Sequence, residues 1–137
     1  MNHEFKLINK DSDLENIFEL KSFAVLSDET FQYIGDSFEW FYGMWNNDYK
    51  EKGLNYYGWT VLDDGDIVQF KNIIESWATL FKYSPPEFEL KIGYDLDKND
   101  FEKFNFSRKN LIQELKSIVN LCDTAITKQI KIVHLGI

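Results

Sequence analysis

Residues 87–137 read EFELKIGYDLDKNDFEKFNFSRKNLIQELKSIVNLCDTAITKQIKIVHLGI, and this stretch decides the fold. Between Glu87 and Tyr94, apolar side chains alternate with polar or small ones, which is typical of a strand with one buried face. The same alternation returns at Phe104 and Phe106. The polar segment between the two runs therefore predicts the turn of an antiparallel hairpin.

A long helix is predicted after the hairpin, from Ser107 to Lys128. A stripe of apolar residues follows one side of it, as a helix that lies on a sheet requires. The stripe consists of Leu111, Leu115, Ile118, Cys122 and Ala125. Because the single cysteine, Cys122, belongs to this stripe, we expect its thiol to be buried and chemically inert.

A final strand is predicted at Ile130–Leu135. In this strand His134 shares a face with Ile132 and lies opposite Val133. The C-terminal segments together predict an α+β fold, in which a small, largely antiparallel sheet has the long helix on one face. The expected strands of this sheet are Glu87–Tyr94, Phe101–Phe106 and Ile130–Leu135.

The first 83 residues have mainly helical periodicity. One helix is predicted at Ser27–Trp45, and another at Asp66–Phe81 before two prolines stop it. The polar stretch 46–58 is interpreted as a loop. These N-terminal helices are expected to pack on the C-terminal strand–strand–helix–strand unit. No linker or repeat divides the chain, so the prediction is a single domain over residues 1–137.

The first of these helices has two aromatic stripes. Its expected core side consists of Phe31, Ile34, Phe38, Phe41, Tyr42 and Trp45. A second apolar stripe, bordered by two acids, falls on the opposite side. Such a helix is either buried on both sides or meets a partner with its outer face. On the second interpretation, the partner-binding residues are Glu29, Tyr33, Asp36, Trp40 and Met44.

Composition supports one well-cored globular domain. The chain has 137 residues, of which 44% are hydrophobic and 17% aromatic. No apolar run approaches the roughly 20 residues that span a bilayer, and the N-terminus has no apolar segment of signal-peptide type. These features predict a cytoplasmic protein that does not enter a membrane.

The formal net charge is −8, and it is concentrated in one region. Residues 11–48 contain nine acids and one base, Lys21, so this region alone accounts for the whole charge. Such a field repels nucleic acid and anionic lipid, and it attracts basic partners. Ordinary solubility is the other explanation of the same charge.

Candidate chemistry is sparse. His134 has no partner at metal-ligand spacing and is expected to be structural, while His3 lies near a terminus that is expected to be mobile. The Asp95–Asn99 segment begins like a calcium-binding loop, but Asp100 stands where that loop needs glycine. No nucleophile, phosphate-loop or cofactor motif is present. We therefore expect no metal, no cofactor and no enzymatic activity.

Three segments have a distinctive sequence: GLNYYGWTVL at Gly53–Leu62, SWATLFKYSPPEFEL at Ser76–Leu90 and IVHLGI at Ile132–Ile137. They resemble a group of short bacterial proteins, some of which are immunity proteins against polymorphic or contact-dependent growth-inhibition toxins. The resemblance covers residues 53–137 and involves packing and turn residues, so no functional residue is carried over. It implies a small cytoplasmic protein that neutralises a cognate toxin domain by binding it.

The acidic, aromatic N-terminal region fits a toxin inhibitor. Many toxin domains act on nucleic acid and are basic, so their inhibitors need an acidic surface, and aromatic anchors supply affinity. Two alternatives stay open. An oligomerising structural or interaction module would use the aromatic stripe against itself, which self-association of the isolated protein would reveal. The other alternative is a small enzyme of unrecognised type.

Overall fold

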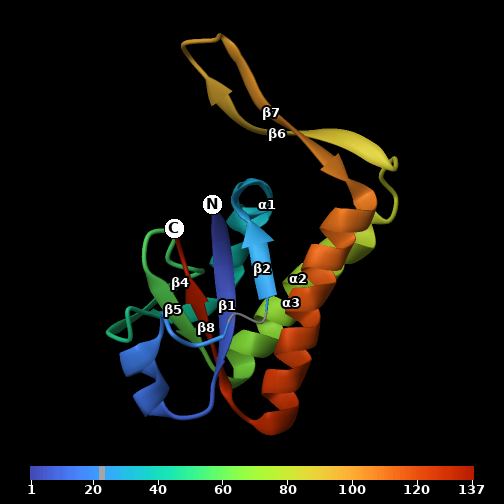
Figure 1. Ribbon diagram of the computed structural model, residues 1–137. Coiled ribbons are helices and arrows are strands. Elements are labelled where there is room, and N and C mark those ends of the chain that lie inside the picture. The colour runs from blue at the N-terminus through green and yellow to red at the C-terminus, as the bar shows by residue number, and fades with distance from the viewer. Residues whose placement is uncertain (22–23) are drawn as a thin grey trace.

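The computed structural model describes residues 1–21 and 24–137, apart from the side chains of Asp11 and Ser12. It has the predicted α+β fold, with a body built on one antiparallel sheet and a hairpin that projects from it (Figure 1). The strands are β1 (Asn2–Ile8), β2 (Ala24–Ser27), β3 (Tyr42–Trp45), β4 (Tyr49–Lys52), β5 (Trp59–Leu62), β6 (Glu87–Asp95), β7 (Asp100–Ser107) and β8 (Lys131–Leu135). The helices are α1 (Asp28–Ile34), α2 (Asp64–Phe81) and α3 (Arg108–Lys128), with 3₁₀ helices η1 (Asp11–Asn16) and η2 (Gly35–Trp40).

The sheet of the body has six strands in the order β2-β1-β8-β5-β3-β4, and all neighbours are antiparallel. β8 lies near its centre because it is apolar on both faces: Ile132 and Val133 are both completely buried. His134 lies on the Ile132 face, in contact with Phe5, as the alternation predicts. Strands from the two ends of the chain thus meet in the middle of the sheet.

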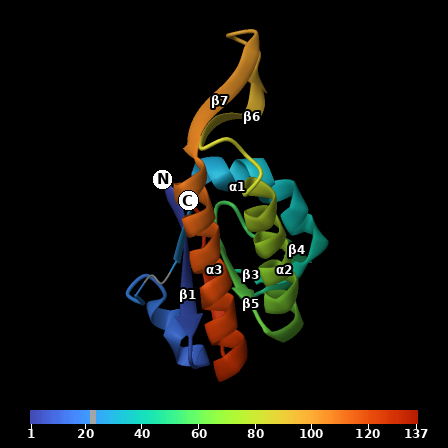
Figure 2. The same ribbon diagram turned by 90° about the vertical axis from the view of Figure 1, so that its right-hand side faces the viewer.

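Helices α2 and α3 lie side by side and cover one face of this sheet (Figure 2). Phe70 of α2 and Leu115 of α3 are completely buried between the layers, and burying such a side chain typically stabilises the fold by about 1.5–3 kcal/mol. Cys122 is buried in the same layer, as predicted, and burial raises the pKa of its thiol to about 12. Among the described helices, none is long and apolar enough to cross a membrane.

A smaller apolar cluster covers the opposite face of the sheet, next to η1. Its buried members are Ile8, Ile17, Val61, Val133 and Leu135. Lys6 is buried on this side, and its ammonium group donates to the carbonyl oxygens of Ile17 at 3.2 Å and Phe18 at 3.4 Å. A buried ammonium group needs such partners, so Lys6 fixes the turn after η1 to β1.

The β6–β7 hairpin is confirmed, but it forms a two-stranded sheet of its own. The prediction that these strands share a sheet with the last strand is therefore wrong. At the base of the hairpin, Phe88, Leu90 and Phe106 pack on the body, whereas the tip stands away from it (Figure 1). An alternating strand needs cover on only one face, and α1 and α3 provide it.

The predicted helix at Ser27–Trp45 is wrong beyond Ile34. There α1 ends, η2 follows, and the remainder is strand β3, which pairs with β4 and β5. A Cβ atom on Gly43 would collide with the side chain of Thr60, which shows how closely β3 lies against β5. Strand pairing of this kind overrides a helical periodicity. The mainly helical interpretation of the first 83 residues is incomplete for the same reason, since their described part also contains β1 to β5.

Candidate functional site

An apolar hollow lies on the surface between η2 and α2. Its volume is about 280 Å³, and its lining consists of Trp40, Asn72, Ile73, Ser76, Trp77 and Leu80. We call it the Trp40 hollow. Trp40 is 72% exposed and Leu80 is 56% exposed, although both side chains are large and apolar. The interpretation in which this segment is buried on both sides is therefore excluded at Trp40.

Tyr33 lies beside the Trp40 hollow. Its ring centroid is 5.9 Å from that of Trp77 and 6.3 Å from that of Phe81. The indole N–H of Trp77 donates to Ser37 Oγ at 3.0 Å, and the Ser37 hydroxyl donates to the carbonyl oxygen of Ile34 at 2.6 Å. These bonds fasten η2 to α2, so the wall of the hollow is formed before any partner arrives.

The other predicted contact residues lie apart from this pair. Glu29 lines a hollow at the base of the hairpin, Asp36 lines a separate groove, and Met44 packs in the apolar cluster on the far face of the sheet. The predicted alignment of Met44 with Trp40 on one helix is wrong because Met44 belongs to strand β3. Of the five predicted residues, Tyr33 and Trp40 thus share a neighbour, because Tyr33 contacts Trp77 and Trp77 lines the hollow with Trp40.

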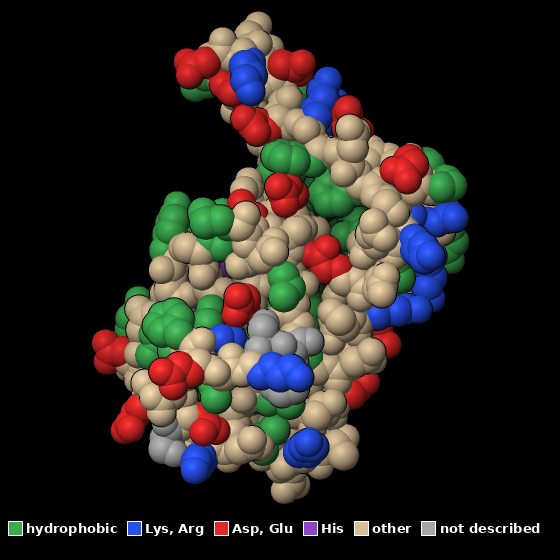
Figure 3. Space-filling model, in the orientation of Figure 1, with side chains coloured by type: hydrophobic (Ala, Val, Ile, Leu, Met, Phe, Trp, Pro, Cys, Tyr) green, Lys and Arg blue, Asp and Glu red, His purple; other side chains and the backbone are tan. Residues whose placement is uncertain are grey.

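A second hollow, of about 400 Å³, lies beside η2, and we call it the η2 groove. Its polar and aromatic lining includes Gln32, Asp36, Glu39, Trp45, Lys52 and Tyr56. Ile92 of β6 also lines it, so the hairpin contributes one wall. In the space-filling view, a notch separates the hairpin from the body, with hydrophobic and acidic side chains at its base (Figure 3).

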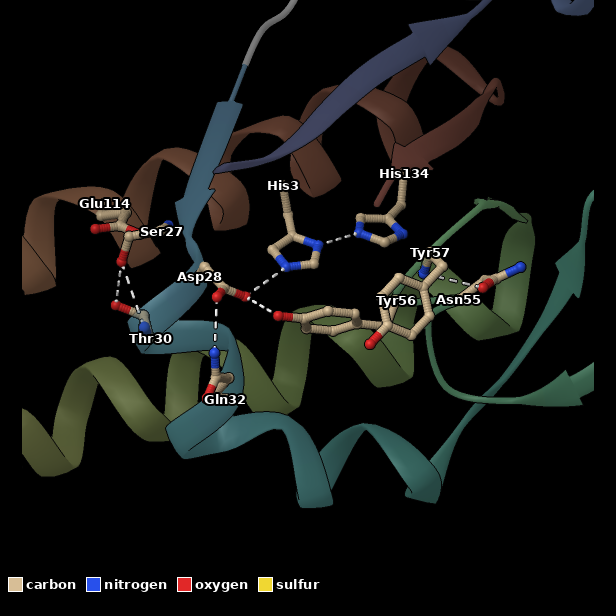
Figure 4. Close-up of polar contacts among 10 residues, drawn as sticks. All are labelled: His3, Ser27, Asp28, Thr30, Gln32, Asn55, Tyr56, Tyr57, Glu114 and His134. Carbon is tan, nitrogen blue, oxygen red and sulfur yellow. Dashed lines mark hydrogen bonds and ion pairs between the residues drawn. The ribbon is translucent and has the colours of Figure 1, made fainter. Parts of the chain in front are cut away.

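A buried polar cluster joins four segments of the chain (Figure 4). The ring of His3 on β1 lies between His134 on β8 and Asp28 at the start of α1. His3 Nδ1 is 3.0 Å from His134 Nε2, and His3 Nε2 is 3.3 Å from Asp28 Oδ1. Asp28 also accepts hydrogen bonds from the Tyr56 hydroxyl at 2.6 Å and from the Gln32 amide at 2.7 Å. Asp28 is therefore the centre of the cluster.

Burial and hydrogen bonding together set the ionisation of Asp28 and Tyr56. Burial would raise the pKa of Asp28, but the hydrogen bonds from Tyr56, Gln32 and His3 outweigh it, so the pKa lies below 3.8. Burial and the Asp28 carboxylate raise the pKa of Tyr56 to about 12. At neutral pH, Asp28 is therefore charged and Tyr56 keeps its proton.

The ionised carboxylate also assigns the histidine tautomers. His3 donates from Nε2 to Asp28, so its Nδ1 is an acceptor and His134 donates to it from Nε2. His134 Nδ1 is then a bare acceptor, and it is buried without a partner among the described residues. Burial lowers the pKa of His3, against the opposing effect of Asp28, and burial together with His3 holds the pKa of His134 well below 6.5. Both rings are neutral at pH 7.

An aspartate–histidine–histidine series has the parts of an acid–base relay, but neither histidine is accessible here. Both rings are completely buried, so a substrate has no path to the imidazoles. Among the described residues, no three or more His, Cys, Asp or Glu side chains are placed so that they could hold a metal ion. The cluster ties β1, β8, α1 and the Tyr56 loop together, because breaking a bond of His3 leaves a buried imidazole nitrogen unpaired.

Sequence reasoning missed His3, Glu39 and Tyr56. The expectation of a mobile terminus around His3 is wrong, because β1 begins at Asn2 and pairs with both β2 and β8. A signal was available, since His3 and Phe5 share the period-two face of β1. No local signal brings Tyr56 to Asp28, because the two residues meet only in the tertiary fold.

No protein-family model, curated protein or solved structure matches the chain. The resemblance to immunity proteins consequently stays a prediction. Function has to be inferred from the geometry and charge of the chain itself.

Proposed function

We propose that this protein is a cytoplasmic immunity protein, which binds and neutralises a cognate bacterial toxin domain through η2 and the surfaces beside it. The observation that carries the proposal is Trp40, which is 72% exposed at the edge of an apolar hollow. Tryptophan is enriched among the few residues that dominate binding energy at protein interfaces. Neither buried histidine offers a competing catalytic surface.

The Trp40 hollow has the character of a protein contact. Its walls are aliphatic and aromatic side chains of η2 and α2, with two small polar residues among them. An apolar side chain of a partner that enters it would remove Trp40, Leu80 and Ile73 from water, which is favourable by about 25 cal/mol per Å² of apolar area. Contiguous exposed apolar surface of this kind commonly marks an interaction site.

Charge on η2 favours a basic partner. Asp36 and Glu39 are exposed, and neither has a Lys, Arg or His nitrogen within 4.0 Å in the described parts of the chain. The chain as a whole has a net charge of −8. Such a field accelerates association with a basic toxin domain and opposes binding to nucleic acid.

Co-expression tests this proposal. The toxin domain to be tested is the variable C-terminal domain of a large secreted protein, if such a protein is encoded immediately upstream of the gene for this protein. Expressed alone, it should arrest growth, and growth should recover when this protein is co-expressed. Arrest that persists in the presence of the unmodified protein would contradict the proposal.

A matched pair of variants connects protection to the Trp40 hollow. Trp40→Ala should fail to protect, whereas Phe18→Ala should protect as well as the unmodified protein. Phe18 is a suitable control because it is an aromatic residue that is 80% exposed, but it follows η1 on the other face of the sheet. Equal protection by the two variants would show that the contact surface lies elsewhere.

An oligomerising module is the second candidate function, because a second copy of the chain would also cover the apolar hollow. Analytical ultracentrifugation of the isolated protein separates the two candidates. The immunity function predicts a monomer across the concentration series. A dimer that Trp40→Ala dissociates would favour the oligomerising module.

A further inference from the structure

We propose that the η2 groove receives an arginine side chain of the partner protein. The existence of that partner rests on the proposed function, whereas the chemistry of the groove is open to a direct test. The volume of about 400 Å³ is ample for one extended side chain. η2 contributes Trp40 to the apolar hollow and two acids to the groove, so one partner surface would contact both.

The 3₁₀ geometry of η2 brings two carboxylates to the groove. Side chains three residues apart eclipse in a 3₁₀ helix, so Asp36 and Glu39 lie one above the other, and both line the groove. Like charges at neighbouring helical positions destabilise each other. A single cation held between the two carboxylates removes this repulsion and gains two charge-assisted hydrogen bonds.

A third negative charge lies behind the wall of the groove. Gln32 and Tyr56 both line the groove, and both donate hydrogen bonds to the ionised Asp28. Because the amide nitrogen of Gln32 is engaged by Asp28, its carbonyl oxygen is left to accept a hydrogen bond from a donor. The groove therefore combines negative potential with acceptors, which a cationic donor requires.

Aromatic side chains in the lining favour arginine over lysine. Trp45 and Tyr56 line the groove, and the indole N–H of Trp45 is held by the carbonyl oxygen of Gly53 at 2.9 Å. A guanidinium group is planar, stacks on aromatic rings and pairs with carboxylates through parallel hydrogen bonds. An ammonium group is a compact and strongly hydrated charge, which gains less from such a lining.

Lys52 is the basic residue in the lining of the groove. Its positive charge repels an incoming arginine side chain. Lys52 is exposed, and neither Asp36 nor Glu39 is within ion-pair distance of it among the described residues. Removing Lys52 should therefore strengthen arginine binding. The groove thus offers variants with opposite expected signs, which a purely structural role would not produce.

A nuclear magnetic resonance titration with N-acetylarginine methylamide tests the groove on the protein alone. We expect saturable shifts at the indole N–H of Trp45 and the side-chain amide of Gln32. The double variant Asp36→Asn/Glu39→Gln should weaken binding at least about tenfold, because two charge-assisted hydrogen bonds are lost. Lys52→Ala should strengthen it about two- to fivefold.

The matching lysine and citrulline amides serve as control probes. The lysine probe has the charge without the planar fork, and the citrulline probe has a similar shape without the charge, so both should bind more weakly than the arginine probe. The arginine site is overturned if no shift saturates, if citrulline binds equally well, or if the double variant binds unchanged. None of these results depends on a toxin, so a failure of arginine binding would leave the proposed immunity function intact. Saturable arginine binding by a protein that gives no protection would support the groove and overturn the immunity function.

Discussion

The central strand β8 and the β6–β7 hairpin come from the same C-terminal stretch, yet their environments are opposite. In β8, all residues from Ile132 to Leu135 are buried, with cover on both faces. In the hairpin, alternate residues such as Phe88 are partly buried, and Leu96 at the tip is 85% exposed. A hydrophobic pattern thus reports how many faces of a strand are covered, but it does not report which strands become its neighbours.

This contrast divides the molecule by role. The sheet, α2 and α3 contain the main core and so provide most of the stability. The hairpin tip contributes little to the core, and η2 presents Asp36, Glu39 and Trp40 to solvent although its Phe38 is buried in the core. Substitutions of buried residues should therefore change stability, and substitutions of the exposed residues of η2 should change binding.

The largest effect is expected in the core of the body. Phe70 is completely buried, and its ring centroid lies 5.3 Å from that of Phe41 and 5.5 Å from that of Phe5. Phe70→Ala should lower the free energy of unfolding by about 3–5 kcal/mol in urea denaturation. A loss under about 1 kcal/mol would break the comparison, because the layer between sheet and helices would then not be the main source of stability.

The buried polar cluster should give the next largest effect. In Asp28→Asn the amide nitrogen cannot accept, so at least one of the three donors that meet Asp28 loses its acceptor. We expect a loss of about 1–3 kcal/mol in the free energy of unfolding. Tyr56→Phe is the matched control: it removes a single donor and should cost less. Equal losses would contradict the central place of Asp28.

Acid should destabilise the body through its two histidines. Burial is the main cause that lowers the pKa of His3 and of His134 from 6.5 in the folded protein. The folded state then binds fewer protons than the unfolded state, so stability is present above pH 6.5 and is lost as the pH falls below it. The expected slope is up to about 1.4 kcal/mol per pH unit for each histidine.

Urea midpoints measured between about pH 7.5 and 5.5 check this slope. His134→Phe should reduce it, because one of the two groups no longer titrates. Burial raises the pKa of Glu114 above 4.5, so protonation of this carboxyl favours the folded state as the pH falls. At the acidic end of the range, Glu114 therefore opposes the effect of the histidines on stability. A profile without any slope in the unmodified protein would show that the histidines are not held neutral by the fold.

The hairpin tip should give the smallest effect on stability. Leu96→Ala should change the free energy of unfolding by less than about 0.5 kcal/mol, because Leu96 is almost fully solvated. Hydrogen exchange sharpens the same contrast: amides at the ends of β6 and β7 should exchange faster than those of β8, since a two-stranded sheet opens locally more easily. Equal protection of β7 and β8 would contradict the division of roles.

Local periodicity was sufficient for the elements whose environment is regular. The hairpin, α2, α3, the face of His134 and the burial of Cys122 all followed from patterns of two or 3.6 residues. These elements bury one continuous stripe or one alternating face, so their own residues carry the information.

The remaining features depend on partners that are distant in the sequence. β1 is a strand because it pairs with β8, at the other end of the chain, and β3 is a strand because Gly43 fits closely against β5. Asp36 and Glu39 would share a face in an α-helix as they do in η2, but Lys52, Tyr56 and Ile92, which also line the groove, come from distant segments. The candidate site could therefore be only partly predicted: Tyr33 and Trp40 both lie beside Trp77, but the pattern does not predict the η2 groove.

The dissociation rate of the complex with the toxin domain tests the central claim most directly. Trp40→Ala should raise this rate about 30-fold, because truncating a central tryptophan typically costs about 2 kcal/mol or more at an interface. Its free energy of unfolding should change by less than about 0.5 kcal/mol, and Phe18→Ala should alter neither quantity. An unchanged dissociation rate for Trp40→Ala would contradict the proposal that the protein binds its partner through this surface.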